Sequence, residues 1–294
     1  MHLCEATGDT SKRPLSGGRP QGLIEHPAAR LEVSMVDGQS AITSIYATNP
    51  LKLLAPVSRG TSVWAYTSSF GGGMVSGDQT ALDVRLHPGV RCFLGTQSST
   101  KVYRNPEGRP TGHRVWAGVG ADSLLVVAPD PIQAFAGSVW RQRQNFFLAP
   151  DANLVVVDWL SSGRQARGER WAFTRFESWN EIHVGTRPWM MDGLVLDPRD
   201  GALTEPFRLG RFDCLALVAV VGPRLADGAR RWVEEISARP VERGATYLAA
   251  GSAREGGAVL RFAGQDGEAV TREIHTGLRF LSSWLDGEPW NRRP

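Results

Sequence analysis

The chain has 294 residues, 41% of them hydrophobic, and its 33 basic against 30 acidic side chains give a formal net charge of +3. This composition excludes a disordered chain, because it supports a real core, and the spread-out basic excess is too small to predict nucleic-acid binding. Its three cysteines, Cys4, Cys92 and Cys214, are far apart in the sequence. Such sparse cysteines favour a reducing, cytoplasmic setting.

Residues 1–22 carry no apolar core segment, so we expect a disordered tail there rather than a signal peptide. Residues 23–294 are expected to form one β-rich domain. The longest aliphatic run, "LALVAVV" at residues 215–221, is far too short to span a bilayer. We therefore expect no contact with a membrane.

The stretch "SSFGGGMVSGDQTALDV" at residues 68–84 is a near match to a phosphate-binding glycine loop. Asp78 stands where a P-loop needs lysine, and the dinucleotide fingerprint fails at Ser76. An alternating pattern, Leu82, Val84 and Leu86, follows the glycines, whereas a phosphate loop must open a helix. The glycines therefore predict a turn or a close packing contact, with a strand after it.

Three turn-plus-strand units resemble one another: "PGVRCFLGTQ" from Pro88, "VGADSLLVVAPD" from Val119 and "APDANLVVVDWL" from Ala149. Each has a turn residue before a short apolar strand, which predicts stacked β layers that bury their faces against their neighbours. Duplicated hairpins in an ordinary β-sandwich would give the same pattern.

The later sequence first continues the strand pattern and then changes to a helical one. Strands are predicted in "FESWNEIHV", "MDGLVLD" and "CLALVAVVG". Residues 227–237 place Trp232, Val233 and Ile236 on one helical face, with Asp227 as a possible cap. Residues 268–285 show helical spacing again, weakened by Gly277. The predicted fold is mainly β, a layered scaffold of stacked sheets with about two C-terminal α-helices.

No motif of enzymatic chemistry is found. None of the six histidines lies at metal-ligand spacing from another histidine or a cysteine, and there is no G-x-S-x-G elbow. Cys92 lies inside "VRCFL", which is typical of a small core residue.

Asp158, in "NLVVVDWLSSGR", is the informative carboxylate. Both faces of its strand are apolar, so an ionised Asp158 needs an arginine, several hydrogen bonds, water or a metal ion. The simplest hypothesis is a structural salt bridge to Arg164, Arg167 or Arg170. A role in handling an ion is the alternative.

The segment "SSGRQARGERWAF" interleaves small residues with arginines and a tryptophan. It fits a solvated loop or edge strand. Because arginine and tryptophan are enriched in binding hot spots, it also predicts a partner-binding patch formed by Arg164, Arg167, Arg170 and Trp171.

Five elements then occur in a characteristic order: "NPLKLL", "GGGMVSGDQTALDV", "GTQSSTKVYRN", "DPIQAFAGSVWRQRQNFFL" and "VVVDWLSSGRQARGERW". With them the chain resembles the urease accessory protein family UreD, called UreH in some bacteria, over roughly residues 25–290. Ser76 departs from the family pattern, which has a glycine there.

This resemblance implies a cytoplasmic scaffold that is not an enzyme. Such a protein binds UreF, joins the GTPase UreG and docks on apo-urease, so that nickel reaches the urease active site. No cofactor is tightly bound, and nickel(II) is in transit, held loosely by scattered carboxylates and waters. Asp78, Asp158 and Glu169 are the candidate residues of the nickel passage, from their place in the family-like motifs.

Two rival functions remain open on the sequence. A β-rich binding module for carbohydrate or nucleic acid would use surface tryptophans and arginines. An enzyme with scattered carboxylates would bring Asp78 and Asp158 together in one pocket.

Overall fold

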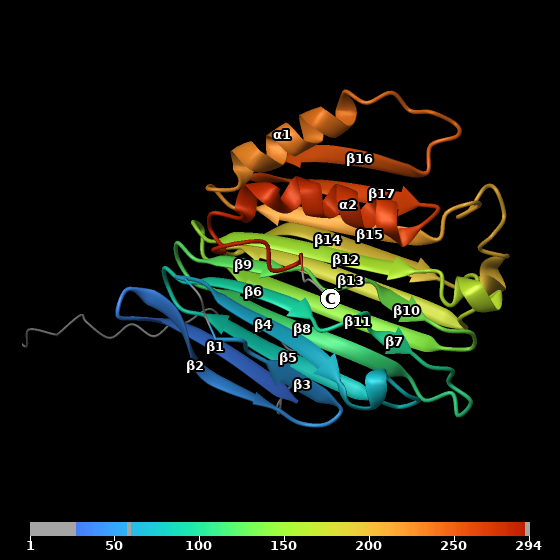
Figure 1. Ribbon diagram of the computed structural model, residues 1–294, viewed down its shortest axis with the longest axis horizontal. Coiled ribbons are helices and arrows are strands. Elements are labelled where there is room, and N and C mark those ends of the chain that lie inside the picture. The colour runs from blue at the N-terminus through green and yellow to red at the C-terminus, as the bar shows by residue number, and fades with distance from the viewer. Residues whose placement is uncertain (1–27, 58–59, 292–294) are drawn as a thin grey trace, which may run out of the picture.

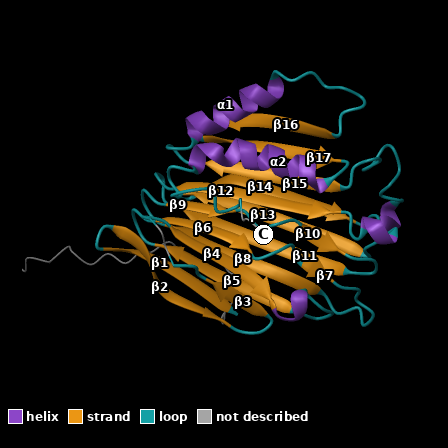
Figure 2. Cartoon of the chain, in the orientation of Figure 1, coloured by secondary structure: helices purple, strands orange, loops and turns teal. Residues whose placement is uncertain are grey.

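The computed structural model describes residues 28–57 and 60–291, so the tail expected at residues 1–22 lies outside the described residues. Strands account for 47% of the structure and helices for 14%. Figures 1 and 2 show the strands lying side by side along a similar axis in stacked sheets, with two helices at the C-terminal end of the stack. The predicted mainly β, layered fold is confirmed.

One sheet, called sheet A here, has seven strands in the order β14-β13-β11-β8-β5-β1-β2. Their bounds are β1 Ala29–Val36, β2 Gln39–Ala47, β5 Gln79–Leu86, β8 Thr111–Val119, β11 Val139–Leu148, β13 Arg175–Val184 and β14 Arg187–Leu196.

The other sheet, sheet B, has ten strands, of which eight follow the order β16-β17-β15-β12-β9-β6-β4-β3. Of the two remaining short strands, β10 pairs with β12 and β7 pairs with β10. Their bounds are β3 Leu51–Leu54, β4 Val63–Ser69, β6 Arg91–Thr96, β7 Lys101–Val102, β9 Leu124–Val127, β10 Ile132–Ala134, β12 Asn153–Ser161, β15 Cys214–Val221, β16 Tyr247–Arg254 and β17 Gly257–Gly264.

The middle of the chain winds as a coil. From β5 to β13 the main strands alternate between sheet A and sheet B, and neighbours within each sheet are parallel. The three similar units supply β6, β9 and β12, where Cys92 aligns with Leu125 and Leu125 with Leu154. Stacked β layers are therefore confirmed. The hairpin alternative is wrong, because hairpins would make these neighbours antiparallel.

Glycines permit the close turns of this coil. Gly89 in the turn after β5 has φ = 81°, a conformation that favours glycine. A side chain at Gly120 would place its Cβ 2.7 Å from the carbonyl oxygen of Leu86, so the turn before β9 requires a residue without one.

Both predicted helices are present, α1 at Ala226–Ser237 and α2 at Gly267–Gly277, followed by the 3-10 turn η4 at Leu278–Leu281. Trp232, Val233 and Ile236 are buried, as their spacing predicts. Asp227 is not the cap of α1: it lies in the first turn of the helix and pairs with Arg230. Asp266, which the pattern does not reveal, caps α2 by accepting a hydrogen bond from the Ala269 amide at 2.7 Å.

Three apolar clusters hold these layers together. One fills the space between the sheets and includes Leu82, Phe146 and Leu154. A second lies between sheet B and the helices and includes Val155 and Trp232. Alternate residues of β12 point into different clusters, which confirms that both faces of this strand are buried. A third, smaller cluster contains Trp140, Trp171 and Phe173.

Candidate functional site: a polar layer between the two sheets

A band of polar side chains interrupts the apolar interior of sheet A. Thr80, His113, Gln142 and Ser178 are aligned with one another on β5, β8, β11 and β13. They occupy the same alternate positions as residues of the core between the sheets, such as Leu82 and Phe146. The next inward position on β11 and β13 is also polar. We call these six residues the polar layer: Thr80, His113, Gln142, Gln144, Ser178 and Asn180.

Hydrogen bonds connect neighbouring members of the polar layer. The Thr80 hydroxyl and His113 Nδ1 lie 2.7 Å apart. Gln142 Nε2 donates to Ser178 Oγ at 3.2 Å, and Gln144 Nε2 donates to Asn180 Oδ1 at 2.8 Å. The layer is therefore an ordered network, as buried polar groups require.

Asp158 reaches this layer from the opposite sheet. On β12 it shares the inward face with Leu154 and Val156. Its Oδ1 accepts a hydrogen bond from Gln142 Nε2 at 2.9 Å. Its Oδ2 accepts two more, from Ser178 Oγ at 2.5 Å and from Asn180 Nδ2 at 2.7 Å. Three neutral donors of sheet A thus bind the carboxylate of sheet B.

No arginine compensates Asp158 among the described residues. Arg164 forms an ion pair with Glu169, and Arg170 forms one with Asp213. The hypothesis of a structural salt bridge from Asp158 to these arginines is therefore wrong. The other possibility weighed on the sequence, several hydrogen bonds, is what the structure contains.

Burial raises the pKa of Asp158 above its ordinary value, because desolvation disfavours the charged carboxylate. The hydrogen bonds from Ser178, Asn180 and Gln142 oppose this effect, while the nearby negative charge of Asp192 adds to it. The structure thus keeps a carboxylate without a cation in a place where its charge is costly.

Asp158 lies in the wall between two cavities. The first, about 100 Å³, is also lined by Thr80, His113 and Gln142. The second, about 200 Å³, is also lined by Asp192 and Arg261. Asp158 is the residue that lines both cavities, and the second is otherwise lined mainly by apolar side chains.

An ion pair bridges the two sheets beside the second cavity. Arg261 on β17 contacts Asp192 on β14, with 2.5 Å between nitrogen and oxygen. The Arg261 side chain is 61% exposed, whereas that of Asp192 is nearly buried. This pair therefore lies where the second cavity meets the surface.

His113 is the imidazole of the first cavity, and burial lowers its pKa to about 4. At neutral pH the ring is therefore uncharged, the form that can bind a metal ion. The spacing of histidines along the sequence does not reveal His113 as a candidate metal ligand, because its polar neighbours come from other strands.

Asp78 and Glu169 do not join Asp158. The Asp78 carboxylate accepts a hydrogen bond from the Val75 amide in its own turn, at 2.8 Å. Glu169 pairs with Arg164 and accepts from the Ala136 amide at 3.1 Å. Neither residue lines the two cavities that share Asp158.

Side chains that could bind a metal ion are scattered in the described part of the chain. Within residues 28–57 and 60–291, no group of three or more histidine, cysteine or acidic side chains is placed to hold one. The thiols of Cys92 and Cys214 are buried, and burial raises the pKa of each to about 12, so they stay protonated.

The predicted partner-binding residues differ in their exposure. Trp171 is only 3% exposed, and its indole N–H donates to the Phe212 carbonyl at 2.9 Å, so its side chain belongs to the core. Arg164 lies over the Phe135 ring while it pairs with Glu169. Arg167 is exposed. A contact role for the three arginines stays a prediction.

The sequence contains a signal for the donors around Asp158 that strand prediction alone does not use. In "VWRQRQNFFL", Gln142 and Gln144 share a face with Trp140, Phe146 and Leu148. Ser178 and Asn180 likewise share a face with Phe176 and Ile182 in the next sheet A strand. Polar residues at core positions of consecutive strands indicate a buried polar network.

Sequence similarity to known proteins covers almost the whole chain. A family model described as UreD urease accessory protein matches residues 25–293. The chain belongs to the UreD family. The urease accessory protein UreD of Sorangium cellulosum is 43% identical over 267 residues, 90% of this chain and 84% of its own.

Other UreD proteins are nearly as similar. The urease accessory protein UreD of an Anaeromyxobacter species is 38% identical over 294 residues, 100% of this chain and 97% of its own. Urease accessory protein D of Arabidopsis thaliana is 35% identical over 213 residues, 70% of this chain and 72% of its own. The function of this UreD protein is therefore that of a urease accessory protein. Among the described residues, both helices are too short to cross a bilayer.

Proposed function

We propose that this UreD protein is a non-catalytic scaffold in the cytoplasm that passes nickel(II) to urease. In this role it binds UreF, joins the GTPase UreG through that complex and docks on apo-urease. Membership of the UreD family supports the assignment to urease maturation. The passage itself rests on one observation: the carboxylate of Asp158 lines two cavities, and no cationic side chain of residues 28–57 and 60–291 pairs with it.

A divalent cation that enters the first cavity meets oxygen and nitrogen ligands of the kind that nickel(II) accepts. His113, Gln142 and Asp158 all line this cavity. At Asp158 the ion meets a negative charge that only neutral hydrogen bonds stabilise, so its arrival relieves the cost of desolvation. Because these ligands do not form a closed cage, the ion is held weakly enough to leave.

Nickel is therefore cargo, and the proposal includes no tightly bound cofactor. Nucleic acid and membrane are not proposed as partners. The enzyme alternative needs Asp78 and Asp158 in one pocket, and their hydrogen-bond partners belong to different parts of the fold. A binding module for carbohydrate or nucleic acid stays the rival, and salt-dependent affinity for RNA or DNA would favour it.

The test is Asp158→Asn, which removes the charge and keeps the shape of the side chain. We expect the variant to fold and to bind UreF, while urease activation in the complete maturation mixture falls at least about tenfold. Asp266→Asn is the matched control, because it makes the same chemical change at a helix cap, where asparagine serves as well as aspartate.

Asp158→Leu is a weaker variant, since it leaves three buried donors without their acceptor. Melting temperature, UreF binding and urease activation are measured on the same preparation. If the activation by Asp158→Asn equals that of the control, or falls only in proportion to its folded fraction, the passage past Asp158 is refuted.

A further inference from the structure

The outer face of sheet A carries neither helix, because α1 and α2 both pack on sheet B (Figures 1 and 2). One row of residues crosses this face on β8, β11, β13 and β14. In register it reads Arg114, Arg143, Trp179 and Gly193. Met191 and Val195 lie on the same side of β14, two residues before and after Gly193.

Trp179 is a preformed apolar anchor on this face. A side chain at Gly193 would place its Cβ 2.5 Å from the Trp179 ring, so the ring lies directly against the glycine backbone. Trp179 is nevertheless 41% exposed, and next to it Met191 is 71% and Val195 39% exposed. A rigid aromatic ring with exposed apolar neighbours is the composition of a binding hot spot.

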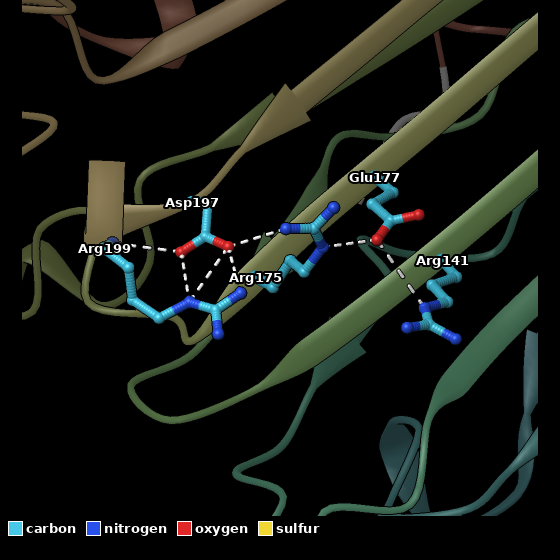
Figure 3. A network of polar contacts seen from close by, with 5 residues as sticks. All are labelled: Arg141, Arg175, Glu177, Asp197 and Arg199. Atoms are coloured by element: carbon cyan, nitrogen blue, oxygen red, sulfur yellow. Dashed lines mark hydrogen bonds and ion pairs between the residues drawn. The ribbon is translucent and has the colours of Figure 1, made fainter. Parts of the chain in front are cut away.

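The arginines of this face are not equally neutralised. Arg141 lies 3.7 Å from Glu177, which also pairs with Arg175, and Arg175 continues to Asp197 and Arg199 (Figure 3). This network satisfies the guanidinium groups on one side of the row.

Arg114 and Arg143 differ from the arginines of that network. They are exposed and aligned on adjacent strands, and within residues 28–57 and 60–291 no carboxylate pairs with either. Two like charges opposite each other in a sheet repel, so an anion that binds between them is favoured.

We propose that this Trp179 face, formed by Arg114, Arg143, Trp179, Met191 and Val195, binds a folded protein that presents carboxylates around an apolar centre. The inference rests on the proposed function, because it takes the partner from the urease maturation complex. Trp179 and Met191 fill the apolar centre of the contact. Arg114 and Arg143 meet the carboxylates at its edge, where they form charge-assisted hydrogen bonds.

A nucleic acid fits this face less well than an acidic protein does. Glu177 and Glu181 lie on the same side of β13 as Trp179, one on each side of it. A phosphate backbone that continues across the sheet past Arg114 and Arg143 would meet the Glu181 carboxylate, whereas a folded protein can place its carboxylates at the two arginines alone. A second copy of this chain is also disfavoured, because a two-fold contact centred on the row would bring the same arginines together.

The experiment reverses both charges in the variant Arg114→Glu/Arg143→Glu. Its matched control is Arg231→Glu/Arg272→Glu, two exposed arginines on α1 and α2, so both variants have the same net charge. The probes are the purified UreF, UreG and apo-urease of the same organism. Affinity for each is measured at low and at moderate salt.

For one of the three probes we expect the reversed pair to weaken binding at least about thirtyfold, the loss of a hot-spot residue, and to lower its salt dependence. The control should bind within about twofold of the wild type. Trp179→Ala should weaken binding of the same probe, with a circular dichroism spectrum like that of the wild type.

Each contrary result has a distinct meaning. If the wild type binds its partners and the reversed pair binds them equally well, the Trp179 face is not their site. A loss confined to self-association, seen by light scattering, or to duplex DNA binding would also overturn the inference. If the wild type binds none of the three probes and activates no urease, the proposed function fails and the inference fails with it.

Discussion

Asn180 on β13 donates a hydrogen bond to Asp158 on β12 at 2.7 Å, across the gap between the two sheets. Together with Ser178 and Gln142 it binds the carboxylate through neutral groups. Dipoles stabilise such a charge less than an opposite charge does. Among the residues that the structure describes, Asp158 is therefore an acid without a cationic partner, which a positive ion could complement.

The first prediction concerns the stability of Asp158→Asn. Folding raises the Asp158 pKa above 3.8, so above that pH the folded protein holds a proton more tightly than the unfolded chain does. The free energy of unfolding therefore falls as the pH rises from 3.8 through the folded-state pKa. We therefore expect Asp158→Asn to melt at or above the wild-type temperature at pH 8, with the difference shrinking toward pH 4. Thermal unfolding followed by circular dichroism measures this. A variant that is clearly less stable at pH 8 would contradict this expectation and would mean that the three hydrogen bonds to the carboxylate outweigh the cost of its charge.

The second prediction concerns His113. Its pKa falls from 6.5 to about 4 on folding, so below pH 6.5 the unfolded chain binds a proton that the folded one does not. At about 1.4 kcal/mol per pH unit, the free energy of unfolding should drop by up to about 3 kcal/mol between pH 6.5 and 4. His113→Gln should lose this part of the pH dependence. Urea unfolding at several pH values compares the two proteins, and parallel curves would contradict the prediction.

The third prediction uses two glycines of α2. A Cβ at Gly277 would lie 2.0 Å from the Trp232 ring, whereas at Gly267 nothing lies within 4 Å of a Cβ. Gly277→Ala should therefore lower the free energy of unfolding by at least about 2 kcal/mol through overpacking. Gly267→Ala should leave it unchanged or raise it by up to about 1 kcal/mol. Chemical unfolding of both variants decides, and equal effects would show that Trp232 moves aside freely.

The fourth prediction is weak nickel binding by the isolated protein. Since the described residues provide no cluster of three ligands, the dissociation constant should be weaker than about 1 µM. Isothermal titration calorimetry should show a shallow curve, and Asp158→Asn should flatten it further. A tight, stoichiometric site that disappears when one histidine or cysteine is changed would contradict this expectation.

The sequence predicted much of the fold because the relevant signals are local. The three similar units became neighbouring parallel strands, since each had a turn residue followed by a short apolar run. The face of Asp158 followed from strand alternation. Both helices were predicted from the spacing of Trp232, Ile236 and Ile274, and both starts were predicted within a residue. The end of α2 was not: the helix stops at Gly277, whereas the predicted pattern continued to residue 285.

The environment of Asp158 could not be predicted, because it depends on which strands face each other. Gln142 and Ser178 come from two other coils, and the arginines nearest in sequence turned out to have partners of their own. Gly277 shows the same limit. The sequence marks Gly277 as unfavourable in a helix. Its packing against Trp232 could not be predicted, because that contact depends on the tertiary structure.

The coiled path of the chain also sets the length of the polar layer. Each full turn adds one strand to sheet A and so extends the row from Thr80 to Ser178 by one strand spacing, which gives about 14 Å over four strands. The length of the row, and with it the proposed path of the ion, can therefore change only in steps of about 5 Å. An insertion of a single residue would instead turn the polar side chains of that strand outward and interrupt the row.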